Sequence, residues 1–134
     1  MANSTQALSL LAQSGATSAT ESLAQGVVEI VAPNLESMLS FYQSLGFTLE
    51  RKTGLFAVIS GFGVRLFVAE NPDAPASPRW TNLRIVVSDV DQIWGFVKEL
   101  GLPVISAISD RFYGLRDFVV ADPAKFEIRF AQML

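Results

Sequence analysis

The residues best suited to chemistry lie in the C-terminal stretch GLRDFVVADPAKFEIRF, residues 114–130, which has the apolar alternation of paired strands. It carries Arg116 next to Asp117, and Glu127 close to Arg129. Carboxylates and guanidinium groups could move protons, bind a charged ligand, or neutralise one another on a solvated face. Which of these applies depends on the side of the sheet to which each charge points.

The residue types that the chain lacks narrow the chemistry. It has no histidine, the commonest metal ligand and general base, and no cysteine. Any metal site would need carboxylate, amide or carbonyl oxygens, which suit hard cations. Glu29 and Glu127 are the candidates for acid–base catalysis, but nothing in their spacing requires it.

Length and composition limit the number of domains and the classes of partner that the protein can have. The 134 residues, 50% of them hydrophobic, suffice for one domain with a sizeable core. The net charge of −3 argues against a nucleic-acid partner. No apolar run approaches the roughly 20 residues that span a bilayer, so we expect no membrane partner. No Lys or Arg precedes Arg51, so the charged start of a signal peptide is missing and we expect a cytoplasmic protein.

Residues 1–25 differ from the rest of the chain. They are rich in Ser, Thr, Ala and Gln and carry a single charge, at Glu21. We expect a flexible or weakly helical extension. The less favoured alternative is a short amphipathic turn that docks on the domain or on a partner subunit through Leu8, Leu10 and Leu11.

From Gly26 the pattern predicts a strand, a helix and three further strands. GVVEIVA (26–32) is a β-branched run. In PNLESMLSFYQSLG (33–46), apolar residues recur at helical spacing between Asn34, a candidate N-cap, and Gly46, a candidate stop. Three strand-like stretches follow: FTLERKT (47–53), GLFAVIS (54–60) and VRLFVAE (64–70).

The same order of elements returns after NPDAPASPR (71–79), a proline-containing linker. TNLRIVV (81–87) reads as a strand, and SDVDQIWGFVKELG (88–101) as a helix capped by Asp89. Shifting the sequence by 55 residues superimposes the two strand–helix units. The shift grows to 60 where Gly54 meets Gly114, and to 62 where RLFVA meets EIRFA. We predict one domain, 26–134, with module one at 26–70 and module two at 80–134.

Three stretches give this repeat a family resemblance: APNLESMLSFYQSLGF, VSDVDQIWGFVKELGLPV and DRFYGLRDFVVADPAKFEIRF. They resemble the vicinal oxygen chelate superfamily, which groups glyoxalase I, extradiol dioxygenases, fosfomycin-resistance enzymes and bleomycin-resistance proteins, and they are most similar to the bleomycin-resistance branch. The resemblance spans about residues 26–132. It implies an α+β fold in which two βαβββ modules in tandem form curved sheets around a cleft. It also implies a homodimer whose clefts lie between module one of one chain and module two of the other.

The resemblance also predicts where a metal would bind. Metal enzymes of the superfamily carry His and Glu on the first and fourth strands of each module. The matching positions here are Val27 and Asn82 for the histidines, and Phe67 and Arg129 for the carboxylates. Two of these side chains have no donor atom and one is a cation, so the set does not suit a divalent ion. We therefore expect no metal, no cofactor and no catalytic residue.

Alternation along the strands then assigns the charges to faces. If Val27, Asn82 and Arg129 face the cleft, the side chains two residues away face it too, which adds Glu29, Arg84 and Glu127. Arg116 and Asp117 lie on opposite faces, and matching their strand to GLFAVIS puts Arg116 in the cleft. The predicted ligand-binding set is Glu29, Phe56, Arg65, Phe67, Trp80, Asn82, Arg84, Phe112, Tyr113, Arg116, Glu127 and Arg129.

Several functions are compatible with such a face. The charges could pair with each other in a satisfied network, or they could orient a small molecule between aromatic walls. We favour a non-catalytic protein that sequesters a drug or metabolite. One alternative is a lyase or dioxygenase with a shifted or absent metal site, or with acid–base catalysis by Glu29 or Glu127. Another is a structural or regulatory subunit with a self-filled cleft. The face holds both signs of charge, so it leaves the charge of a ligand open.

Overall fold

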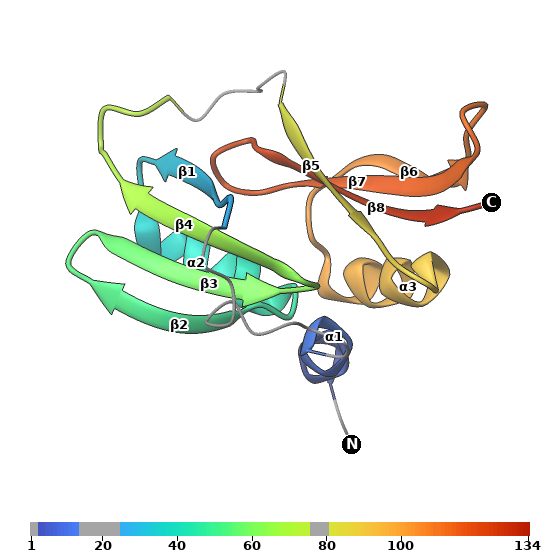
Figure 1. The fold of residues 1–134 in the computed structure, drawn as a ribbon, viewed down its shortest axis with the longest axis horizontal. Coiled ribbons are helices and arrows are strands. Elements are labelled where there is room, and N and C mark those ends of the chain that lie inside the picture. The colour runs from blue at the N-terminus through green and yellow to red at the C-terminus, as the bar shows by residue number, and fades with distance from the viewer. Residues whose placement is uncertain (1–2, 14–24, 76–80) are drawn as a thin grey trace.

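The computed structural model describes residues 3–13, 25–75 and 81–134. Its elements, in chain order, are α1 (Ser4–Gln13), β1 (Val28–Ala32), α2 (Leu35–Ser44), β2 (Thr48–Thr53), β3 (Phe56–Gly61), β4 (Val64–Glu70), β5 (Asn82–Val86), α3 (Val90–Leu100), β6 (Val104–Asp110), β7 (Leu115–Ala121) and β8 (Glu127–Met133). The strands form a first sheet, ordered β1-β4-β3-β2, and a second sheet, ordered β5-β8-β7-β6 (Figure 1). In both sheets the outer strand that precedes the helix pairs in parallel, and the other pairs are antiparallel. This is the predicted α+β fold of two βαβββ modules.

The two module helices begin at the predicted caps. The side chain of Asn34 accepts a hydrogen bond from the backbone N–H of Ser37, and that of Asp89 accepts one from Gln92. α3 ends at Gly101, whose φ of 67° lies in the left-handed region that glycine tolerates best. α2 packs on the first sheet and α3 on the second.

Strand alternation places the core between each sheet and its helix. Ile30, Leu66 and Val68 are buried under α2, and Ile128 and Phe130 under α3. Burying a side chain of this size contributes roughly 2–3 kcal/mol relative to leaving it in water. Among the described residues, no helix of the same module packs on the opposite face of each sheet, and we call that face the open face.

The two modules also pack against each other. Tyr42 in α2 donates a 2.7 Å hydrogen bond to the buried carboxylate of Asp122, in the turn between β7 and β8. The same carboxylate accepts from the backbone N–H groups of Ala124 and Phe126. A single buried apolar cluster therefore includes residues from both sheets.

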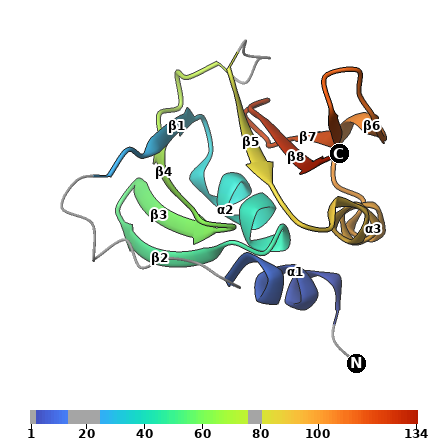
Figure 2. The ribbon, with the colours of Figure 1, turned by 45° about the vertical axis from the view of Figure 1, so that its right-hand side comes forward.

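The N-terminal segment forms an α-helix over Ser4–Gln13 that docks on the domain, where a flexible or weakly helical extension was favoured. Leu8 and Ala12 are buried, and α1 packs against α3 and β3 beneath the two modules (Figure 2). The backbone N–H of Phe62 donates to the carbonyl of Ala12 at 2.8 Å. Apolar contacts of Leu8 therefore outweigh the polar composition of this segment. Residues 14–24 lie outside the described part of the chain.

One glycine permits this docking. Gly46 has a φ of 106°, and a Cβ at this position would lie 2.7 Å from the carbonyl carbon of Leu8. Only a residue without a side chain lets the backbones of α1 and the α2–β2 turn approach so closely.

Among the described residues, no helix has both the length and the apolar character that a bilayer crossing requires.

Candidate functional site

The open face of the first sheet carries aromatic and charged side chains. Glu29 lies beside Phe67 across the β1–β4 pair, and Val58 lies beside Phe67 across the β3–β4 pair, so these three share a face. Phe56 points to the same side, and its ring meets that of Phe67 edge to face at a centroid distance of 5.2 Å. The predicted candidates of module one thus lie together.

Arg65 on this face is held by an acidic partner that the sequence did not reveal. It donates from Nε and Nη2 to the two carboxylate oxygens of Glu50, at 2.8 and 2.7 Å. The hydrogen bond from Arg65 holds the pKa of Glu50 below its usual value. A hollow of about 290 Å³ lies over this pair and is also lined by Arg51, Val58 and Phe67. Alternation did not assign Glu50 to this face because β2 has an irregularity between Leu49 and Arg51.

The open face of the second sheet holds the larger polar cluster. Asn82 lies beside Glu127, and Arg84 beside Arg129, across the parallel β5–β8 pair. These four side chains were predicted to share a face, and the register brings them together. Glu127 Oε1 accepts from Arg129 Nη2 at 3.3 Å.

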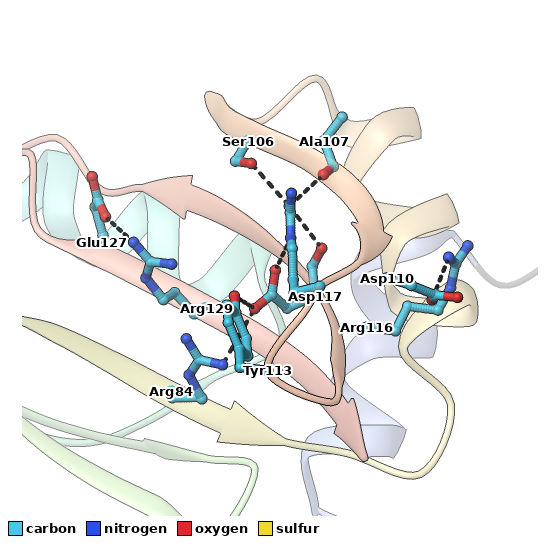
Figure 3. Close-up of polar contacts among 10 residues, drawn as sticks. Arg84, Ser106, Ala107, Asp110, Tyr113, Arg116, Asp117, Glu127 and Arg129 are labelled. Carbon is cyan, nitrogen blue, oxygen red and sulfur yellow. Dashed lines mark hydrogen bonds and ion pairs between the residues drawn. The ribbon is translucent and has the colours of Figure 1, made fainter. Parts of the chain in front are cut away.

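Asp117 is the centre of this cluster, although it was not among the predicted candidates (Figure 3). Its carboxylate is buried and accepts from Tyr113 Oη at 2.6 Å, Arg111 Nε at 2.7 Å and Arg84 Nη1 at 3.2 Å. The Arg84 guanidinium also lies over the Tyr113 ring, 5.3 Å from its centroid.

The surroundings of Asp117 determine its charge. Burial alone would raise the pKa of this carboxyl, but the hydrogen bonds from Tyr113 and Arg111 and the positive charges of Arg111 and Arg84 together lower it. Asp117 is therefore an ionised, well-satisfied anion near neutral pH. Such a group is a poor general base.

Arg111 supports the cluster from the β6–β7 turn. Besides Asp117, it donates to Ser106 Oγ at 2.9 Å and to the carbonyl of Ala107 at 2.8 Å. It follows the last residue of β6, so strand alternation could not assign its face. The sequence offered no signal for its role.

The prediction that Arg116 faces the cleft is wrong. This side chain points to the helix side of β7, where it binds Asp91 of α3 at 2.8 Å and Asp110 at 3.1 Å. Its cross-strand neighbour Gln132 likewise contacts the start of α3 through Val90. The hydrogen bond from Arg116 lowers the pKa of Asp91.

The error comes from a shift of one residue. In the first sheet Phe56 lies beside Ala69, and in the second sheet the equivalent Ala131 lies beside Asp117. Phe56 therefore corresponds to Asp117, an offset of 61 residues, and not to Arg116, an offset of 60. A slip of one residue along a strand exchanges the two faces.

The remaining candidates lie at the edge of the cluster or outside the described residues. Phe112 is fully exposed in the turn before β7, and its ring contacts that of Tyr113. Asn82 is exposed at the start of β5. Trp80 lies in the part of the chain that is not described. The binding roles of all these side chains stay predictions.

The four positions that would hold a metal in this fold do not fit one. Val27 and Phe67 have no donor atom, and Arg129 brings a positive charge beside Asn82 and Glu127. Within residues 3–13, 25–75 and 81–134, no three or more His, Cys, Asp or Glu side chains come together as a metal site.

The family of the chain follows from its sequence and fold together. Residues 24–130 match the family model described as the Glyoxalase/Bleomycin resistance protein/Dioxygenase superfamily. The chain belongs to this superfamily. A search of curated protein sequences finds no match.

Solved structures share the fold at low sequence identity. A glyoxalase/bleomycin resistance protein/dioxygenase from Alicyclobacillus acidocaldarius has a TM-score of 0.74 and 21% identity, covering 84% of this chain and 92% of the other. A bleomycin-binding protein in complex with bleomycin has a TM-score of 0.69 and 16% identity, covering 83% of this chain and 99% of the other. The genomically encoded fosfomycin resistance protein of Listeria monocytogenes has a TM-score of 0.70 and 12% identity, covering 83% of this chain and 93% of the other. At these identities the likeness concerns the fold.

Proposed function

We propose that this protein binds a small molecule on the open faces of its sheets and sequesters it without chemical change. The observation that carries the proposal is the polar cluster on the second sheet. Half-buried arginines, an exposed aromatic ring and a buried carboxylate share a face that no helix of the module covers. Binding sites of small molecules commonly combine apolar walls with a few convergent polar groups.

The absence of chemistry in this proposal rests on the residues of the two faces. Asp117 and Glu50 each have a lowered pKa because arginines and, for Asp117, a tyrosine bind them. Neither is tuned towards neutral pH, as an efficient general base would be. The four metal positions of the fold carry side chains that do not suit a divalent cation. The related structure with bound bleomycin supports ligand capture as a use of this fold.

A homodimer is part of the proposal. The second sheet and its surroundings expose Val86 and Phe112, which are 57% and 100% accessible in the single chain. A second copy could cover them and complete a cleft between two modules. Size-exclusion chromatography with light scattering should give twice the chain mass of 14.6 kDa. A monomer at micromolar concentration would contradict this part.

Ligand binding can be tested by calorimetry and thermal shift with a panel of bleomycin, planar cations and aromatic anions. We expect saturable binding of at least one class, with the compound recovered unchanged. Arg84→Gln, on the open face, should weaken this binding, whereas the matched control Arg116→Gln, which removes a charge of the same sign from the helix side of the same sheet, should not. If no compound of a broad panel binds, that result favours the alternative of a structural subunit with a self-filled cleft.

The similarity to a fosfomycin resistance protein is the reason to test the alternative function, an enzyme with a shifted or absent metal site. Elemental analysis of the purified protein separates the two functions. One tightly held divalent ion per chain would contradict the argument from the four metal positions and favour an enzyme with a shifted site.

A further inference from the structure

The arginines of the described residues differ in how fully their donors are used. Five are half-buried, with side chains between 23% and 31% exposed. Three of these donate at least three hydrogen bonds each, namely Arg65, Arg111 and Arg116. The other two, Arg84 and Arg129, are as deeply buried but each donates one hydrogen bond to a described residue.

These two arginines, called here the arginine pair, are direct neighbours. They face each other across the parallel β5–β8 pair on the open face, with strands about 4.8 Å apart (Figure 3). Like charges in this arrangement destabilise a sheet. Arg129 Nε is buried and has no acceptor among the described residues. An unsatisfied buried donor is destabilising, and the one nitrogen of this guanidinium that bonds a described residue is Nη2.

The neighbouring carboxylates do not neutralise the arginine pair. Asp117 is shared among Arg84, Arg111 and Tyr113, so little of its acceptor capacity is left. Glu127 reaches only one nitrogen of Arg129, at the long distance of 3.3 Å. The cluster thus contains three guanidinium groups and two carboxylates, which leaves one excess positive charge.

We infer that the arginine pair anchors an oxyanion, either a carboxylate or a phosphate, on the ligand of the proposed binding function. The planar donor fork of arginine matches the oxygens of such groups, and hydrogen bonds between charged partners are about twice as strong as neutral ones. The inference rests on that proposed function and adds the sign and chemistry of the ligand. A cation at this place would meet the excess positive charge.

The surroundings of the pair indicate the rest of the ligand. The Tyr113 ring lies under the Arg84 guanidinium, and Tyr113 as a whole residue is 44% exposed. Val86, two residues beyond Arg84 on the same face, is 57% exposed. Both offer apolar contact beside the charged anchor. The ligand class is therefore a small molecule with an apolar ring and one oxyanion.

The test compares three compounds that share a ring and differ in charge: benzoate, phenyl phosphate and benzamidine. Each is titrated into the full-length protein by calorimetry, while the Arg129 Nε–H signal is followed by NMR. We expect benzoate or phenyl phosphate to bind saturably and to shift that signal. The preferred anion distinguishes the carboxylate from the phosphate.

Variants assign the binding to the arginine pair. Arg129→Gln and Arg84→Gln should each weaken binding about tenfold or more, because each removes charge-assisted hydrogen bonds. Arg129→Lys, which keeps the charge but lacks the fork, should lose part of the affinity. Arg116→Gln should leave it unchanged. Thermal melts check that each variant is folded. If a glutamine variant is unfolded, Arg129→Lys takes its place in the binding test.

The outcomes separate this inference from the general function. Binding of benzamidine without either anion would overturn the oxyanion assignment and leave small-molecule binding intact. Anion binding that survives substitution of both arginines would also overturn it. If neither anion binds, the assignment fails, and bleomycin or another compound of the wider panel then decides whether the protein binds small molecules at all.

Discussion

At the scale of single residues, Asp117 determines the character of the second sheet. A carboxylate that is fully buried on an open face survives because two arginines and a tyrosine bind it. It holds Arg84 and Tyr113 in place and leaves most donors of Arg84 without an acceptor among the described residues. In the proposed function it positions these groups rather than reacts.

This role predicts a specific dependence of stability on pH. The folded-state pKa of Asp117 lies below the usual value of 3.8, so its network stabilises the fold above that pH and is lost as the pH falls through the folded pKa. Asp117→Asn should lower the free energy of unfolding by about 1–3 kcal/mol at neutral pH and reduce its loss in acid. Urea denaturation between neutral and strongly acidic pH measures both.

Asp73→Asn provides the control for this prediction, because Asp73 is an exposed aspartate outside the sheets. It should change neither the stability nor its pH dependence appreciably. Equal behaviour of the two variants would contradict the network described for Asp117.

At the scale of elements, the strands, helices and caps of the two modules could be predicted because period and capping residues agree in each. The open-face residues Glu29, Phe67, Arg84 and Glu127 followed from alternation within single strands. The choice between Arg116 and Asp117 did not, because it needed the length of a turn. One extra residue in the second module exchanges the faces of β7.

Partners that lie off the regular strands also escaped prediction. Arg111 lies in a turn and Glu50 at an irregularity of β2, where side-chain direction depends on tertiary contacts. The docking of α1 depends on Leu8 meeting Gly46, a contact between segments that the sequence pattern does not connect.

The contact at Gly46 can be tested directly. Gly46→Ala would place a methyl group against the backbone of Leu8 and strain a positive φ, so we expect a loss of about 2 kcal/mol or more and release of α1. Chemical denaturation and hydrogen exchange of residues 4–13 measure these effects. Gly54→Ala is the control, because its φ is also positive but a Cβ at that position would meet no atom within 4 Å. Similar losses in both variants would indicate backbone strain rather than the α1 contact.

At the scale of the whole molecule, the two modules of one chain form a single core. The hydrogen bond from Tyr42 to Asp122 joins residues of different modules in the interior. Tyr42→Phe should therefore lower the free energy of unfolding by about 1–2 kcal/mol while unfolding stays a single transition. Urea denaturation followed by fluorescence checks this. A variant as stable as the original protein would show that the bond does not help to hold the modules together.

The central claim is that the open faces bind a small molecule without a metal and without changing it. The most direct measurement is a calorimetric titration of chelator-treated protein with a ligand identified from the panel, followed by mass spectrometry of the recovered compound. We predict saturable binding, the same affinity after Mg²⁺, Mn²⁺ or Zn²⁺ is added back, and an unchanged ligand. Binding that appears only with a divalent ion, or a ligand recovered as a product, would contradict the account.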